Sequence, residues 1–267
     1  MLRGVSRQDE VSPVGGGSSK ELLPAPARTS PPPSGSVLWL EKQPEAAADT
    51  TTPCRKAVIP IAGLGTRMFP MTGVVPKAFL PIVHLPTAGS GAAPLLRPFL
   101  HSLLRYVLAE ATGVEEVCVI ISEDQRDMIE AYFDMLSSKP SVWGPYEAKG
   151  GHYVSEVSEI REIGRKLTLL VQKEPKGFGH AVLQAEEFVG EDEWFVLLLG
   201  DHLYTQNEGD ASCLTTLLSS FRSMHPRVQM TSVGVIDAKA APVSGVLRCA
   251  GYNAETMVCD VVEMIEK

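Results

Sequence analysis

The stretch KAVIPIAGLGTRMFPMTGVVPKAFLPIV, residues 56–83, joins an apolar run to a loop that holds glycines and two cations. The run KAVIPI is short and apolar, which predicts a buried strand. Gly63 and Gly65 follow it at once, and Arg67 and Lys77 stand among uncharged neighbours. Glycines after a strand let backbone N–H groups approach a phosphate, and cations at that edge can face its charge. The stretch therefore predicts a phosphate-binding loop at the carboxyl end of a strand.

Two familiar nucleotide-binding patterns do not fit this loop. The third glycine of the dinucleotide fingerprint would fall on Met68, and the pattern G-x-x-x-x-G-K-[ST] does not occur. A lone G-x-G after a strand is more often a tight turn. The signal comes from the combination of G-x-G-T-R, eight further residues, and then P-K.

The chain after residue 54 alternates apolar runs with helical patterns. Strands are predicted at 56–61, 116–122, 166–172, 193–200 and 227–237, and helices at 94–113, 122–136, 177–188 and 213–224. Apolar strands separated by helices are typical of a sheet covered on both faces, so the pattern predicts an α/β protein with a mostly parallel sheet. The last residues, 244–267, predict a hairpin with its turn at 251–256.

Local signals refine the expected helices. One face of the first helix collects four apolar residues: Leu96, Leu100, Leu103 and Val107. Gly113 is expected to end this helix. Ser122 and Gln125 have the spacing of a capping box at the start of the next one. Residues 138–166 are ambiguous between a loop and an exposed helix.

Residues 1–54 differ from the rest and predict a disordered leader. The segment is rich in Pro, Gly and Ser and has no apolar period. Arg3, Arg7 and Arg28 favour a transit peptide, whereas the acids Asp9 and Glu10 argue against one. The two interpretations stay open. The domain that carries the function is expected over residues 55–267.

Charge and cysteine usage exclude several classes of protein. The net charge of −8 argues against a general nucleic-acid or anionic-membrane surface, and no apolar run approaches the roughly 20 residues of a spanning helix. The five cysteines are scattered and form no C-x-x-C. A structural zinc site is therefore not expected, and Cys118 is interpreted as a core residue. A reducing compartment fits, so we expect the cytoplasm, or an organelle if the leader is a transit peptide.

Four ordered motifs resemble the sugar-phosphate nucleotidyltransferase family, and within it the bacterial-type UTP–glucose-1-phosphate uridylyltransferases. The motifs are KAVIPIAGLGTRM, PKAFLP, KGFGHAV and LLLGDH, and the resemblance covers roughly residues 55–267. It implies a Rossmann-like three-layer α/β nucleotidyltransferase fold. It also implies transfer of a uridylyl group from UTP to glucose 1-phosphate, with pyrophosphate as the leaving group and Mg²⁺ as cofactor.

The resemblance assigns roles to individual residues. For the base it implies backbone contacts from Ala62 and Gly63, the amide of Gln172, and support from Gly177. For the phosphates it implies Gly65, Thr66, Arg67 and Lys77, with Arg67 and Lys77 as the catalytic cations. Asp201 would bind the magnesium ion, and Glu266 and Lys267 match a pair that meets the sugar phosphate. His180 and His202 are left outside the chemistry, His202 as a residue behind Asp201.

The chain departs from the family pattern at several points. Ala78 replaces the usual acid or amide after P-K, residues 84–96 form a longer insert, and LGDH stands where relatives carry PDV. The chain also stops at Lys267, whereas the family continues to a second metal aspartate, so we expect a chain truncated at its C-terminus.

Two alternatives to uridylyl transfer remain. One is a thymidylyl-, cytidylyl- or guanylyltransferase on the same fold, and the other is a non-catalytic nucleotide-binding protein. No nucleic-acid or membrane partner is expected, and a homo-oligomer is left open.

Overall fold

The computed structural model describes residues 53–84, 94–136, 138–191, 193–202, 209–223, 230–232, 246–253 and 258–265, together with the backbone of residues 37–40. Most of the predicted leader and the pair Glu266–Lys267 lie outside the described residues. The leader therefore stays a prediction.

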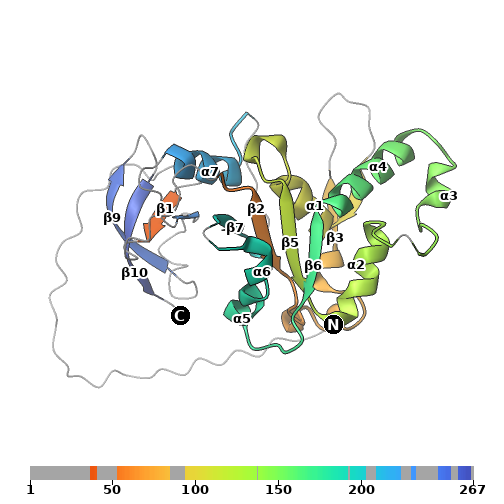
Figure 1. The fold of residues 1–267 in the computed structure, drawn as a ribbon, viewed down its shortest axis with the longest axis horizontal. Helices are drawn as coiled ribbons and strands as arrows, with labels where there is room; N and C mark the ends of the chain where they lie inside the picture. The colour runs from red at the N-terminus through yellow and green to blue at the C-terminus, as the bar shows by residue number, and fades with distance from the viewer. Residues whose placement is uncertain are drawn as a thin grey trace, which may run out of the picture. The chain divides into compact units, whose positions relative to one another are not determined.

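A four-stranded parallel sheet forms the centre of the fold (Figure 1). Its strands are β2 (Lys56–Pro60), β5 (Glu116–Ile121), β6 (Leu167–Val171) and β7 (Phe195–Leu197). Their order is β6-β5-β2-β7, and each neighbouring pair is parallel. The prediction of an α/β fold with a parallel sheet is confirmed. The predicted strand at 193–200 is shorter than expected, because regular pairing ends at Leu197.

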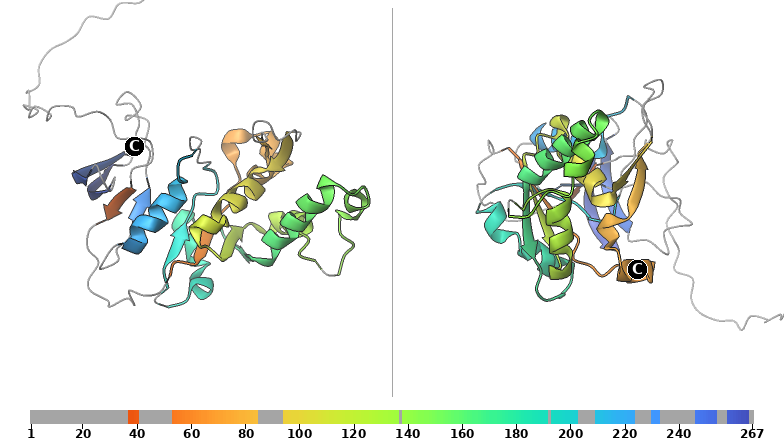
Figure 2. Two further views of the ribbon diagram at one scale, coloured as in Figure 1. Left: turned by 90° about the horizontal axis from the view of Figure 1, so that it is seen from above. Right: turned by 90° about the vertical axis from the view of Figure 1, so that its right-hand side faces the viewer.

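Helices cover the two faces of this sheet unequally. Side chains alternate between faces along a strand, so Ala57 and Ile59 enter one core while Val58 enters another. The larger core packs against α1 (Phe99–Val107), α2 (Arg126–Tyr132), α4 (His152–Arg165) and α7 (Cys213–Ser223). The smaller core packs against α5 (Phe178–Leu183) and α6 (Glu186–Val189), which Figure 2 shows across the sheet from α1. These are the three layers that the sequence predicted.

The predicted helix over 94–113 is wrong in its first third. Residues Leu95–Pro98 form β4, which pairs antiparallel with β3 (Pro81–His84). Leu96 therefore lies on an exposed strand, with 70% of its surface accessible, instead of on the core face of a helix. Proline cannot continue a helix, and α1 begins only after Pro98. Gly113, with φ 71°, ends the short 3₁₀ turn η4 (Glu110–Thr112) and not α1.

Two other helical predictions need smaller corrections. The segment 177–188 divides into α5 and α6, with Ala185 at the cap between them. The segment 122–136 begins as the 3₁₀ turn η5 (Glu123–Gln125), and its predicted capping box is present at Ser122 and Gln125. The ambiguous segment 138–166 holds α3 (Gly144–Glu147) and α4, and α4 buries several apolar side chains.

A second sheet has the order β8-β1-β10-β9. It contains β1 (Val37–Leu40), β8 (Met230–Ser232), β9 (Val246–Asn253) and β10 (Val258–Ile265). The antiparallel pairing of β9 with β10 confirms the predicted terminal hairpin. The predicted turn at 251–256 begins too early, because residues 251–253 still belong to β9, and residues 254–257 lie outside the described residues. Two features were not predicted. Of the strand expected at 227–237, the structure describes only β8, which pairs with β1 outside the parallel sheet, and β1 itself lies within the predicted leader.

Cys118 is fully buried in β5, as predicted, and none of the five cysteines forms a disulfide. None of the helices in the described part of the chain combines the length and the apolar character that crossing a bilayer requires.

Candidate functional site

The loop after β2 begins from a firmly held point. The Ile61 N–H donates to the Ile120 carbonyl oxygen at 2.8 Å, which extends the pairing of β2 with β5 by one residue. The Gln125 side chain donates through Nε2 to the Ile61 carbonyl oxygen at 3.1 Å, while its Oε1 accepts from the Ser122 N–H at 3.0 Å. Gln125 is almost fully buried. It therefore ties the start of the loop to the next strand end, a role that its capping-box spacing alone did not reveal.

The two glycines of the loop have different tasks. Gly65 has a φ of 65°, and a Cβ there would lie 2.9 Å from Thr72 Cγ2 and 3.4 Å from Lys77 Cβ. The Thr72 hydroxyl donates to the Gly65 carbonyl oxygen at 3.0 Å, so the loop folds back on itself at this residue. A Cβ on Gly63 would meet nothing within 4 Å. Gly65 thus serves the loop's own fold, whereas Gly63 leaves space open beside half-buried Ala62.

Two further predicted phosphate ligands lie on the exposed part of the loop. Thr66 and Arg67 belong to the 3₁₀ turn η1 (Thr66–Met68), and both are solvent-accessible. Within the described part of the chain, no ion pair engages the Arg67 guanidinium. Its five N–H donors are therefore free to face an anion that approaches the loop.

Lys77 and Asp201 form an ion pair at the carboxyl edge of the sheet. Lys77 opens the 3₁₀ turn η3 (Lys77–Phe79), and its Nζ lies 2.8 Å from Asp201 Oδ2. The two side chains are 37% and 47% exposed, so a ligand can reach both. The hydrogen bond from Lys77 holds the pKa of the Asp201 carboxyl below its usual range, which keeps it ionised. Nε2 of His202 lies 3.7 Å from the other carboxylate oxygen.

A glycine explains how Asp201 reaches this position. The Leu198 N–H donates to the Val58 carbonyl oxygen at 3.0 Å, and the chain then passes close over the end of β2. A Cβ on Gly200 would overlap Ile61 Cγ2 and would lie 2.6 Å from the Pro60 carbonyl oxygen. Only a residue without a side chain fits there. Gly200 was not predicted as a site residue, although a glycine directly before an aspartate at a strand end indicates such a close approach.

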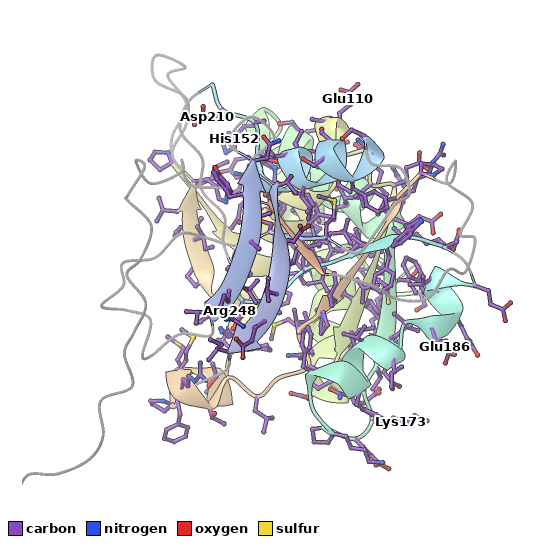
Figure 3. The ribbon with its side chains drawn as sticks, turned by 90° about the vertical axis from the view of Figure 1, so that its left-hand side faces the viewer. Glu110, His152, Lys173, Glu186, Asp210 and Arg248 are labelled. Carbon is purple, nitrogen blue, oxygen red and sulfur yellow. The ribbon has the colours of Figure 1, made fainter. Side chains whose placement is uncertain are left out.

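Gln172 lies at the end of β6, and its side-chain amide is held in one orientation. Its backbone N–H donates to the Ile121 carbonyl oxygen at 2.8 Å. Its Nε2 donates to the Gly177 carbonyl oxygen at 3.2 Å and lies 3.0 Å from His180 Nδ1. A carbonyl oxygen can only accept, so the amide nitrogen must face Gly177 and Oε1 must point elsewhere. Gly177, with φ 102°, caps α5, and Figure 3 shows the exposed Lys173 at the same end.

The structure brings the predicted residues into two groups. Gly65, Lys77 and Asp201 form one group, and Gln172 with Gly177 forms the other; both stand at the carboxyl ends of the parallel strands. Ligands of open parallel sheets bind at this edge. Glu266 and Lys267 lie outside the described residues, so their predicted role stays a prediction.

Asp201 is the carboxylate at this edge that could ligate a magnesium ion. The described residues contain no group of three or more His, Cys, Asp or Glu side chains that could hold a metal by themselves. Mg²⁺ commonly uses one or two carboxylates and completes its shell with water and substrate phosphates. A single ionised, accessible carboxylate beside a phosphate-binding loop meets that need, so Asp201 fits the ion only when the ion arrives with phosphates.

Comparison with known proteins identifies the family of the chain. The family described as Nucleotidyl transferase matches residues 56–267. A UTP–glucose-1-phosphate uridylyltransferase of Streptococcus pyogenes is 34% identical over 220 residues, which cover 78% of this chain and 63% of the relative. The UTP–glucose-1-phosphate uridylyltransferase YngB of Bacillus subtilis is 32% identical over 217 residues, covering 80% of this chain and 63% of that protein.

Solved structures give a weaker match. A crystal structure of UDP-glucose pyrophosphorylase complexed with UDP-glucose is 27% identical, with a TM-score of 0.46, and the match covers 64% of this chain and 54% of that one. The chain thus spans a little under two thirds of the length of the curated relatives that it matches.

Proposed function

The chain belongs to the nucleotidyl transferase family, and we propose that it transfers the uridylyl group of UTP to glucose 1-phosphate. The observation that carries the proposal is the pairing of Lys77 with Asp201 beside the glycine loop. A cation for phosphate and a carboxylate for a metal ion stand within one hydrogen bond of each other, at the edge where such ligands bind. The names of the uridylyltransferase relatives supply the substrates.

The proposed reaction is an in-line displacement at phosphorus. An oxygen of the sugar 1-phosphate attacks the α-phosphorus of UTP, the bond to the β-phosphate breaks, and pyrophosphate leaves. Such chemistry depends on positioning and on neutralising charge, and it needs no covalent intermediate. Lys77 and Arg67 would face the oxygens on which charge increases, while backbone N–H groups around Gly63 and Gly65 would hold the phosphates.

Entry of substrate would exchange the partners of the ion pair. A phosphate would accept from the Lys77 ammonium in place of Asp201. The freed Asp201 carboxylate would hold Mg²⁺, which when bound neutralises phosphate charge. Each partner of the pair thus gains a new, oppositely charged ligand. Before substrate arrives, the pair holds the two groups 2.8 Å apart and keeps the Asp201 carboxyl ionised.

The orientation of Gln172 supports uracil over cytosine. Its Nε2 is engaged by Gly177, so Oε1 is the amide atom left for a base. Uracil and thymine carry an N–H donor at N3, which suits an acceptor, whereas N3 of cytosine is itself an acceptor. A buried polar group that faces the wrong partner disfavours that ligand strongly. The preference for UTP over CTP would therefore come from an oxygen atom whose position Gly177 fixes.

Titration calorimetry with UTP, dTTP, CTP and ATP in the presence of Mg²⁺ tests this proposal. UTP and dTTP should bind more tightly than CTP and ATP, by about tenfold or more. Gln172→Met should remove the difference between UTP and CTP. Equal affinity for all four nucleotides would refute the base pocket. Preference for dTTP over UTP would favour the thymidylyl alternative.

Turnover separates an enzyme from a nucleotide-binding protein. The second possibility has a specific motive, because the chain covers 63% of its relatives. Pyrophosphate release from UTP, dependent on glucose 1-phosphate, would establish the transferase. Tight UTP binding without any release would favour the binding protein. The cytoplasm, or an organelle if residues 1–54 are a transit peptide, and a homo-oligomer remain part of the proposal, and five cysteines without a disulfide agree with a reducing compartment.

A further inference from the structure

The backbone that carries Lys77 is a very short turn. Within η3, the Phe79 N–H donates to the Pro76 carbonyl oxygen at 2.8 Å, and the Leu80 N–H donates to that of Lys77 at 3.2 Å. A lysine side chain is a flexible four-carbon stem. Its ammonium can be aimed at Asp201 only if the turn beneath it is fixed. Two internal hydrogen bonds do not fix a turn, so the surroundings of η3 decide where Lys77 points.

The turn rests on the larger core through its last two residues. Ala78 is 3% exposed and belongs to that core, at the position where the family pattern has an acid or amide. The Phe79 ring meets the Tyr132 ring edge to face, with centroids 5.6 Å apart and planes at 85°. The Phe99 N–H donates to the Leu80 carbonyl oxygen at 2.9 Å. Phe79 is therefore the side chain through which η3 packs against α2.

Tyr132 is itself held from several directions. Its hydroxyl is hydrogen-bonded to His101 Nδ1 in α1 at 2.8 Å. The Trp143 Nε1–H donates to the backbone carbonyl oxygen of Tyr132 at 2.8 Å, and the centroids of the two rings lie 5.3 Å apart. Burial lowers the pKa of His101 to about 3 and raises the pKa of Tyr132. Both side chains stay neutral around pH 7, so this link keeps its form across the working range of an enzyme.

We infer that Phe79 and Tyr132 are positioning residues, which hold Lys77 over Asp201 from inside the core without touching substrate. The role of Lys77 in binding phosphate rests on the proposed function. The position of its ammonium group beside Asp201 does not, because the protein's own side chains form that ion pair. The inference extends the candidate site inward, from the exposed ammonium through η3 to α2 and α1.

The first test observes the ammonium group of Lys77 in the full, ligand-free chain. An ammonium held in an ion pair gives a resolved ¹H–¹⁵N resonance, which Lys77→Met identifies by its loss. Asp201→Asn should move that resonance towards the position of a free lysine. Phe79→Leu should move it the same way, and Phe79→Tyr, which keeps the ring, should restore it. An unchanged resonance in Phe79→Leu would overturn the inference.

A matched control removes an equivalent ring elsewhere. Phe221 is 7% exposed and meets Trp194 at 5.0 Å and 67°, in the same core but on α7. Because Phe221 is buried and Phe79 only half-buried, Phe221→Leu should lower the unfolding midpoint at least as much as Phe79→Leu while leaving the Lys77 resonance unchanged. If both variants moved the resonance equally, Phe79 would be a general core residue and the inference would fail. Tyr132→Phe, which cuts only the hydroxyl link to His101, should give a smaller shift than Phe79→Leu.

The second test is a double-mutant cycle on UTP binding. Phe79→Leu should weaken binding of Mg²⁺ and UTP about tenfold, within the usual range for coupled neighbours. In the Lys77→Met background the same change should have little effect, because there is no ammonium left to position. Equal losses in both backgrounds would contradict the inference. If the unaltered chain bound no UTP, the proposed function would fail, and the ammonium spectra would still decide the role of Phe79.

Discussion

One lysine stands at the amino end of β2 and another at the carboxyl edge of the same sheet, and their ammonium groups are held differently. The Lys56 Nζ lies 2.5 Å from Glu193 Oε2 and donates to the carbonyl oxygens of Phe188 at 2.8 Å and Val189 at 3.3 Å. An ammonium has three N–H donors. All three are used, and the side chain, 23% exposed, also lies over the Phe188 ring.

Lys77 has one acceptor among the described residues, Asp201, and its side chain is 37% exposed. Two of its three donors therefore remain for water or a ligand. An ion pair alone therefore says little about function. The two lysines differ in the number of unused N–H donors: Lys56 uses all three and joins the end of α6 to the sheet, whereas Lys77 uses one at an edge where ligands bind.

The largest expected effect comes from Lys77→Met, which keeps the apolar stem and removes the charge. Loss of one such charge should lower kcat/KM with UTP about a hundredfold or more, while the midpoint of urea unfolding changes little, since exposed ion pairs contribute little to stability. Steady-state kinetics and urea titration measure the two quantities. Near-normal kcat/KM would remove Lys77 from the site.

Lys56→Met should produce the opposite pattern. The change leaves Glu193 and two carbonyl oxygens without their donor, so the free energy of unfolding should fall by about 1–3 kcal/mol. Affinity for UTP should stay within twofold of the unaltered chain, because the residue is at the far end of β2. A variant that lost UTP affinity at unchanged stability would break the comparison.

Substitutions at the two loop glycines should also separate UTP binding from stability, with smaller effects than the lysine variants. Gly63→Ala adds a methyl group where the fold has open space, so stability should be unchanged while UTP affinity falls roughly tenfold. Gly65→Ala forces a side chain into the left-handed region beside Thr72 and should lower the unfolding midpoint as well. Calorimetry and thermal unfolding on both variants check this. Identical behaviour of the two variants would show that Gly63 faces no ligand.

The smallest effect concerns acid stability. The folded-state pKa of Asp201 lies below its ordinary 3.8 because Lys77 donates to it. The stability that this pair contributes is therefore present above pH 3.8 and is lost as pH falls through the lowered pKa. Asp201→Asn should lower the urea midpoint slightly at pH 7 and not at all at strongly acid pH. In the Lys77→Met background the difference should be absent at both pH values.

The sheet could be predicted from sequence because its strands are marked by composition. Runs such as VCVII, residues 117–121, are buried on both faces of the sheet and therefore apolar throughout. The helix predicted through Pro98 failed because helical spacing of leucines also occurs where β4 meets α1, and the proline, not the spacing, decides the boundary. The strand β1 is the short apolar run VLWL, but it stands alone in a Pro- and Ser-rich segment, and its partners β8 and β10 come from the other end of the chain.

The sequence indicated which residues gather at the candidate site, but it did not indicate the contacts that orient their side chains. Residues at the carboxyl ends of parallel strands converge, which places Gly65, Lys77 and Asp201 at one edge. The direction of the Gln172 amide depends on contacts with Gly177 and His180, whose positions are set by the packing of α5. The contact of Gly200 with β2 likewise depends on how closely two strand ends pass.

Because Cys118 is buried in the middle of β5, its reaction with a thiol reagent can report opening of the central sheet. Burial raises the pKa of that thiol to about 12, so an alkylating reagent at neutral pH meets neither a thiolate nor an accessible sulfur. Cys249, in contrast, is exposed and can be modified on the native chain. Once exposed Cys249 and half-buried Cys213 are blocked, the rate at which the peptide that contains Cys118 gains a mass label measures how often the central sheet opens.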